Sequence, residues 1–137
     1  MIFYLLNDLK YRLIYFINTF MQTPSNITLD KTKTLLTLTF DGTKYPLSAE
    51  YLRVYSPSAE VVGHGPGQET LQVGKENVTI SRIEPTGNYA IVLFFSDDHD
   101  SGIYSWEHLY KLATEQDKLW SGYLTRLKDA GHSHKQH

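Results

Sequence analysis

Cysteine is absent from this chain. Disulfide bonds, thiolate zinc sites, cysteine-ligated iron–sulfur clusters and cysteine nucleophiles are therefore excluded within the chain itself. A chain without cysteine does not depend on an oxidising compartment, and we expect a cytoplasmic protein. At 137 residues the chain has room for one domain that buries its own hydrophobic core.

An excess of charge of either sign is also absent. The 13 Lys and Arg residues are balanced by 15 Asp and Glu residues, so the net charge is −2 with histidine neutral. Nucleic-acid binding therefore has no electrostatic support. No uninterrupted apolar run approaches the ~20 residues that a helix needs to cross a bilayer, and we expect no membrane association.

Residues 1–20 differ from the rest of the chain. Their apolar stretches are interrupted by Asp8, Lys10 and Arg12. A secretory signal carries its positive charges before the apolar core, so this segment does not resemble one. We expect a dispensable extension that arises from a misplaced start codon, with Met21 as the true start. A peripheral amphipathic anchor and an added helix packed on the domain are the alternatives.

Residues 26–47 predict three antiparallel strands. Apolar residues alternate with threonine over 34–40, a pattern typical of a half-buried strand. Asp41-Gly42 is the favoured pair for a two-residue hairpin turn. Pro46 lacks an N–H group and indicates that the returning strand lies at a sheet edge.

Short helices and three further strands are expected to follow. Ser48 is typical of a helix N-cap, and Ser105 would cap the C-terminal helical segment in the same way. Strands are predicted at 78–81, 89–95 and 101–104. The run 89–95 is apolar throughout, which predicts a central strand covered on both faces.

These elements together predict an α+β fold, because helices are set among and after the strands rather than alternating with them. We expect a two-layer sandwich with a mostly antiparallel sheet of about five to six strands, short helices and a C-terminal helical segment. The domain is placed at 21–130. Gly131 ends the last helix, and we expect 131–137 to form a disordered tail.

Four segments of the chain, 47–60, 64–67, 83–90 and 98–106, carry a family resemblance. The chain resembles the gamma-butyrobetaine hydroxylase-like N-terminal domain family, also catalogued as the domain of unknown function DUF971, over residues 24–128. The resemblance implies the same two-layer fold. It also implies that this chain is not an enzyme, because the dioxygenase activity of the larger hydroxylases belongs to a separate catalytic domain.

The resemblance also bears on metal binding. The hydroxylase members hold a structural zinc through three cysteines and a later histidine. Those positions fall on Ser56, Ser58 and Val61 here, with His99 as the later ligand. Neither serine nor valine supplies the softness and charge of a thiolate, so we expect no zinc at this place and no cofactor.

A different metal site is the alternative. His64 and His99, together with Asp98 or Asp100, would offer two imidazoles and a carboxylate. That ligand set suits non-haem iron, and zinc accepts the same donors. No local spacing ties these residues together, so a metal site forms only if the fold brings their side chains close to one another.

The same region is predicted to form a docking surface. Without a metal, the cleft beside the family's zinc position would be rimmed by His64, Gly65 and Gly67, with His99 and Tyr104 at its edge. By resemblance, the same domain is fused to hydroxylase domains and to Mrp-type iron–sulfur carrier ATPases. We therefore expect a small non-catalytic binding or adaptor module whose protein partner belongs to iron or iron–sulfur metabolism, such as the carrier machinery.

Overall fold

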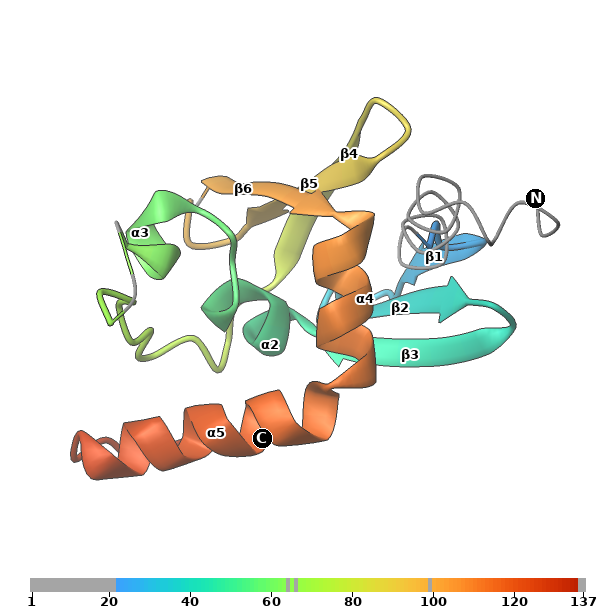
Figure 1. Ribbon diagram of the computed structural model, residues 1–137. Helices are drawn as coiled ribbons and strands as arrows, with labels where there is room; N and C mark the ends of the chain where they lie inside the picture. The colour runs from blue at the N-terminus through green and yellow to red at the C-terminus, as the bar shows by residue number, and fades with distance from the viewer. Residues whose placement is uncertain (1–21, 64, 66, 99, 136–137) are drawn as a thin grey trace, which may run out of the picture.

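The computed structural model describes residues 22–63, 65, 67–98 and 100–135, without the side chains of Asp100 and Ser101. Within this part of the chain, six strands form two three-stranded antiparallel sheets, helices α2 and α4 pack on them, and α5 lies beside α2 (Figure 1). The predicted α+β fold is confirmed. The predictions for residues 1–20 lie outside the described residues. None of the described helices combines the length and apolar character that a membrane span requires.

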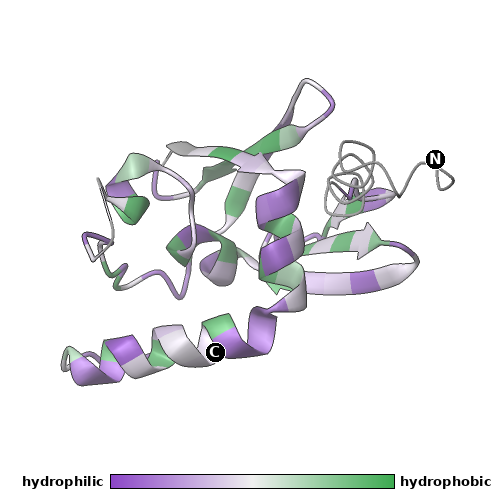
Figure 2. Cartoon of the chain, viewed as in Figure 1, coloured by the Kyte–Doolittle hydropathy of each residue, from purple (hydrophilic) through white to green (hydrophobic). Residues whose placement is uncertain are grey.

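The first sheet has the order β1-β2-β3. Its strands are β1 (Asn26–Leu29), β2 (Leu35–Phe40) and β3 (Thr43–Ser48). Strand β2 buries every second residue from Leu36 to Phe40, and the apolar and polar residues alternate along it in Figure 2. Asp41 and Gly42 have φ angles of 50° and 81°, and positive values at both positions suit the predicted tight hairpin turn. Pro46 lies in the edge strand β3, as predicted.

The second sheet has the order β4-β5-β6. Its strands are β4 (Ile80–Thr86), β5 (Ala90–Phe95) and β6 (Asp100–Ser105). The prediction that the central strand is covered on both faces is wrong, because Val92 and Phe94 are only half-buried. The guanidinium of Arg82 instead lies 4.1 Å from the centre of the Phe94 ring. The sequence analysis predicted a strand only over 78–81, but β4 extends through Pro85, and this proline again occupies an edge strand.

Two of the four described helices begin directly after the serines that the sequence predicts as caps. They are α2 (Ala49–Val54), α3 (Ala59–Val62), α4 (Trp106–Thr114) and α5 (Gln116–Asp129). The Ser48 hydroxyl accepts the Tyr51 N–H at 3.0 Å, and the Ser105 hydroxyl accepts the His108 N–H at 3.1 Å. Both serines therefore satisfy an amide that the first helical turn leaves without a partner.

One hydrophobic core joins both sheets to α2 and α4. Its fully buried members include Leu36, Leu38, Leu47, Leu52, Ile80, Leu93, Leu109 and Leu112. A smaller apolar cluster, made by Val54, Tyr123 and Leu127, attaches α5 to the end of α2. Leu119 and Trp120 of the same helix pack against the main core.

The C-terminal end of α2 is capped by side chains from other elements. A helix leaves the carbonyls of its last turn without intrahelical partners. The Tyr104 hydroxyl of β6 donates to the Leu52 carbonyl at 2.6 Å, and both groups are buried. The His108 imidazole of α4 lies 2.9 Å, through its Nε2 atom, from the Tyr55 carbonyl. These two bonds fix α2 against the second sheet and α4.

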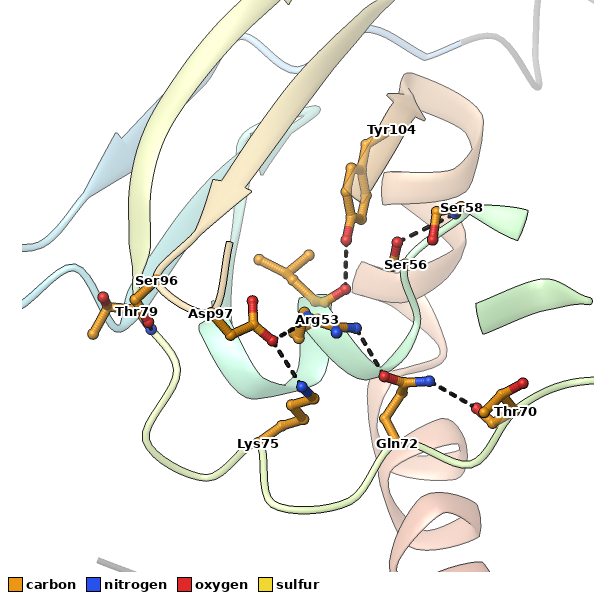
Figure 3. Close-up of polar contacts among 11 residues, drawn as sticks. Arg53, Ser56, Ser58, Thr70, Gln72, Lys75, Thr79, Ser96, Asp97 and Tyr104 are labelled. Atoms are coloured by element: carbon orange, nitrogen blue, oxygen red, sulfur yellow. Dashed lines mark hydrogen bonds and ion pairs between the residues drawn. The ribbon is translucent and has the colours of Figure 1, made fainter. Parts of the chain in front are cut away.

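A buried arginine fixes the segment that leads into the second sheet. Arg53 is 5% exposed, and its Nε atom lies 2.9 Å from Asp97 Oδ2. Its Nη1 atom donates to Gln72 Oε1 at 3.0 Å, while Lys75 Nζ reaches the same Asp97 oxygen at 2.8 Å (Figure 3). The Gln72 amide donates in turn to the Thr70 carbonyl. The network holds residues 70–75 against α2.

The C-terminal residues return to the domain. We predicted a disordered tail over 131–137; the structure describes its residues up to Lys135, and these contact the domain. His134 contacts Glu50, and the Lys135 amide donates to Glu76. These contacts have no local signal in the sequence, because the two glutamates lie 84 and 59 residues from the tail residues that they meet.

Replacing Tyr104 with phenylalanine should destabilise the domain by about 1–3 kcal/mol. The buried Leu52 carbonyl would lose its donor without gaining access to water. Urea unfolding followed by circular dichroism measures the change. Tyr89 is 52% exposed, and Tyr89→Phe serves as the control that should leave the midpoint unchanged. Equal midpoints for both variants would show that the Tyr104 bond contributes nothing.

Replacing Asp97 with asparagine should cost about 2 kcal/mol at neutral pH, since the buried Arg53 would lose its charged partner. Burial works against the Asp97 carboxylate, but its bonds to Lys75 and Arg53 outweigh burial and lower its pKa to about 2. The contribution is therefore present above pH 4 and is lost as the pH falls towards 2.

Unfolding free energies of wild type and Asp97→Asn, measured from pH 7 to pH 2, test this. The two curves should converge at the acidic end. Glu84→Gln is the matched control, because its pair with Arg82 is exposed and should contribute little. A constant gap between the curves would contradict the assignment.

Candidate functional site

A small pocket lies between the α2–α3 segment, the 69–72 segment and helices α4 and α5. Its volume is about 140 Å³. It is lined by Val54, Tyr55, Ser56, Val61, Val62, Glu69, Thr70, Gln72, His108, Tyr123 and Arg126. These residues come from five separate stretches of the chain, so only the folded domain forms the pocket.

The floor of the pocket is apolar and rigid. Val54, Val61 and Tyr123 are each more than nine-tenths buried. The Tyr123 hydroxyl donates to the Gln72 carbonyl at 2.7 Å, which ties α5 to the wall that the Arg53 network holds. Val62 lies at the rim and is 47% exposed. An exposed valine next to an apolar floor favours contact with an apolar group from outside.

Polar groups surround the floor. His108 presents one nitrogen to the Tyr55 carbonyl, so this Nε2 atom carries the hydrogen and Nδ1 is left as an acceptor. Burial lowers the pKa of His108, an effect that the bond to Tyr55 only partly offsets. The imidazole is therefore neutral near pH 7. Arg126 donates to the Tyr55 hydroxyl at 3.3 Å, and Glu69 adds an exposed carboxylate to the lining.

The sequence-predicted site residues are only partly placed. His64 and His99 lie outside the described residues, so the predicted metal site and the predicted histidine edge stay predictions. Gly65 and Gly67 lie in the loop after α3, and neither has an atom within 4 Å of the position that a Cβ would take. Tyr104 is fully buried in the core, and 0% of its surface is accessible to solvent. The prediction that Tyr104 contacts a partner at the edge of a cleft is therefore wrong, because its hydroxyl donates to the buried Leu52 carbonyl.

The family's zinc positions do not fit a zinc ion in this chain. Ser56 is fully buried, and its hydroxyl accepts the Ser58 N–H at 3.2 Å. Val61 offers no donor atom and lines the apolar pocket. Within the part of the chain that the structure describes, no group of three His, Cys, Asp or Glu residues could hold a metal ion.

The segment that carries two of these positions contacts the second sheet. A Cβ built on Gly102 of β6 would lie 3.5 Å from the Ser58 Cα atom. The segment that carries Ser56 and Ser58 therefore packs against the strand that follows residue 99.

The pocket residues on α4 and α5 were missed by the sequence analysis. His108 is placed by the Ser105 cap, and Arg126 lies on the polar side of an amphipathic helix. Neither position carries a local signal, because the groups that they meet around Tyr55 are 53 and 71 residues away. Only the tertiary fold brings them together.

Comparison with known proteins gives a family and structural neighbours. Residues 27–110 match the family described as gamma-butyrobetaine hydroxylase-like, N-terminal. A solution NMR structure is 51% identical with a TM-score of 0.73, covering 82% of this chain and 90% of that chain. A second NMR structure is 46% identical with a TM-score of 0.70, covering 84% and 86%.

A crystal structure extends the comparison. It is of a protein of unknown function from Acidithiobacillus ferrooxidans that belongs to the DUF971 family. It is 34% identical with a TM-score of 0.55 and covers 68% of this chain and 94% of that chain. No curated protein matches the chain. The family match covers more than half of the residues, and the chain belongs to the gamma-butyrobetaine hydroxylase-like N-terminal family.

Proposed function

We propose that the chain is a small, non-catalytic binding module that docks a protein partner at the pocket between α2, α3, α4 and α5. The observation that carries this proposal is the pocket itself: a concave apolar floor with an exposed valine and a polar rim. A volume of about 140 Å³ suits one inserted side chain rather than an extended substrate. Anchor side chains buried in such pockets dominate the affinity of many interfaces.

The polar groups support binding rather than catalysis. A hydrolytic site needs a nucleophile within reach of a base that is oriented by a third group. The Ser56 hydroxyl is buried and accepts the Ser58 N–H, while the Tyr123 hydroxyl donates to Gln72. The hydrogen-bearing nitrogen of His108 is committed to the Tyr55 carbonyl. These groups fix the walls of the pocket.

The rim indicates the chemistry of the partner. Neutral His108 offers an acceptor nitrogen, and Arg126 offers exposed N–H groups on the other side. An apolar side chain flanked by a hydrogen-bond donor and a carboxylate would match both. The link to iron or iron–sulfur carrier proteins rests on the family resemblance, in which this domain is fused to such carriers.

Replacing Val62 with aspartate should weaken partner capture at least about tenfold, since a charge would be placed against an apolar floor. Affinity purification with quantitative mass spectrometry measures the captured protein. Val73 is 43% exposed and does not line the pocket, so Val73→Asp is the matched control. The urea concentration at the midpoint of unfolding should be the same for both variants as for the wild type.

Two outcomes separate the parts of the proposal. Equal capture by both variants would reject docking at the pocket. Loss of capture with Val62→Asp, where the captured proteins have no role in iron or iron–sulfur metabolism, would support the docking site and reject the iron link.

A further inference from the structure

Two open grooves meet where α2 begins. The first lies between α2 and α5 and is lined by Pro46, Ser48, Glu50, Tyr51, Gln116, Asp117, Trp120 and His134. The second lies between the start of α2, the β1–β2 turn and the segment before β4, and it is lined by Asp30, Thr32, Thr34, Leu35, Ser48, Glu50, Glu76, Asn77 and Val78. Ser48 and Glu50 line both grooves. The two therefore form one continuous furrow, here named the α2 furrow.

The lining of the α2 furrow is acidic. Four carboxylates contribute to it, those of Asp30, Glu50, Glu76 and Asp117. Among the described residues that line the furrow there is no Lys or Arg. The indole of Trp120 adds aromatic surface at the α5 end. Carboxylates favour a cation that donates hydrogen bonds, and an aromatic ring attracts the same cation. The lining therefore suits a basic side chain.

The chain places its own C-terminal tail in this furrow. The Nε2 atom of His134 lies 2.7 Å from Glu50 Oε2, and the two side chains are 12% and 11% exposed. The imidazole meets the Trp120 ring edge-on, with centroids 5.5 Å apart. One residue further, the Lys135 N–H donates to Glu76 Oε2 at 2.9 Å. The furrow thus accommodates a peptide segment, whose backbone and side chain both donate to its carboxylates.

The tail does not satisfy the furrow completely. The buried Nδ1 atom of His134 has no hydrogen-bond partner in the described part of the chain, and a buried nitrogen without a partner costs free energy. Asp117 lines the same groove, and its carboxylate forms no hydrogen bond or ion pair with a described residue. A guanidinium carries five N–H donors in a planar fork, so it can donate to Glu50 and Asp117 together. An arginine side chain therefore fits this groove better than the histidine that occupies it.

We propose that the α2 furrow binds a basic, arginine-bearing peptide of a protein partner, and that the tail occupies the furrow as an internal competitor. The arginine takes the place of His134, pairs with Glu50 and lies beside the Trp120 ring. Because the tail is covalently attached, it competes at an effective concentration on the order of millimolar. Only a peptide with a better fit displaces it, so the tail sets a threshold of affinity for the partner.

This site is separate from the pocket of the proposed function. None of the described residues lines both the pocket and the furrow. The pocket has an apolar floor, whereas the furrow is lined by carboxylates. The two proposals therefore stand or fall independently.

A labelled peptide tests the furrow. The probe is a fluorescein-labelled peptide with the sequence of residues 130–135 that carries His134→Arg, and fluorescence anisotropy measures its binding to the full chain at about 0.1 M salt. The His134→Ala chain should bind the probe at least about tenfold more tightly than the wild type, because its own tail competes less. A peptide that carries His134→Glu instead should not bind. Equal affinity of the wild type and His134→Ala would overturn the proposal.

Further variants of the His134→Ala chain locate the binding site. Glu50→Gln should weaken binding of the probe about tenfold and Asp117→Asn about threefold, since each removes a charge from the furrow. Glu107 is exposed on α4 and does not line the furrow, so Glu107→Gln is the matched control and should leave the Kd unchanged. Circular dichroism checks that each variant folds, and Asp117→Asn carries the test if Glu50→Gln does not.

Two results would reject the site. Equal losses from Glu107→Gln and from the furrow variants would show adsorption by overall charge. Equal affinity for the unmodified tail peptide and for the arginine peptide would assign the furrow to the tail of a second copy of this chain rather than to a basic partner.

Discussion

The capping of α2 by side chains from elsewhere is the constraint on which the rest of the structure depends. A six-residue helix has hardly any carbonyls that its own turns can satisfy, so its end must be completed by other elements. Tyr104 and His108 complete it and thereby fix the helix in direction as well as position. Arg53 projects from that fixed helix, and its network places the wall of residues 70–75.

The pocket and the C-terminal tail both contact α5. This helix contributes one wall of the pocket through Tyr123 and carries Trp120, against which His134 packs. Its Leu119 and Trp120 pack against the main core, and its Tyr123 and Leu127 are buried beside Val54. Helix α5 therefore connects the pocket wall to the hydrophobic core.

Local signals in the sequence predicted the elements well, and long-range contacts explain what was missed. The Asp41-Gly42 turn and the serine caps depend only on neighbours in the chain. Tyr104 looked like a surface aromatic because its acceptor is 52 residues away. The apolar run of β5 could not reveal that Arg82 would lie over Phe94 from the next strand. The pocket follows from contacts of the same long range.

Each sheet carries a proline on an edge strand, Pro46 in β3 and Pro85 in β4. A proline interrupts the row of free N–H donors that an edge would otherwise offer to a further strand. These two edges are therefore poor templates for an added strand, whether from another copy of the chain or from an extended peptide. Recognition through side chains of the helical layer remains open, and the same prolines help the domain to resist edge-to-edge aggregation.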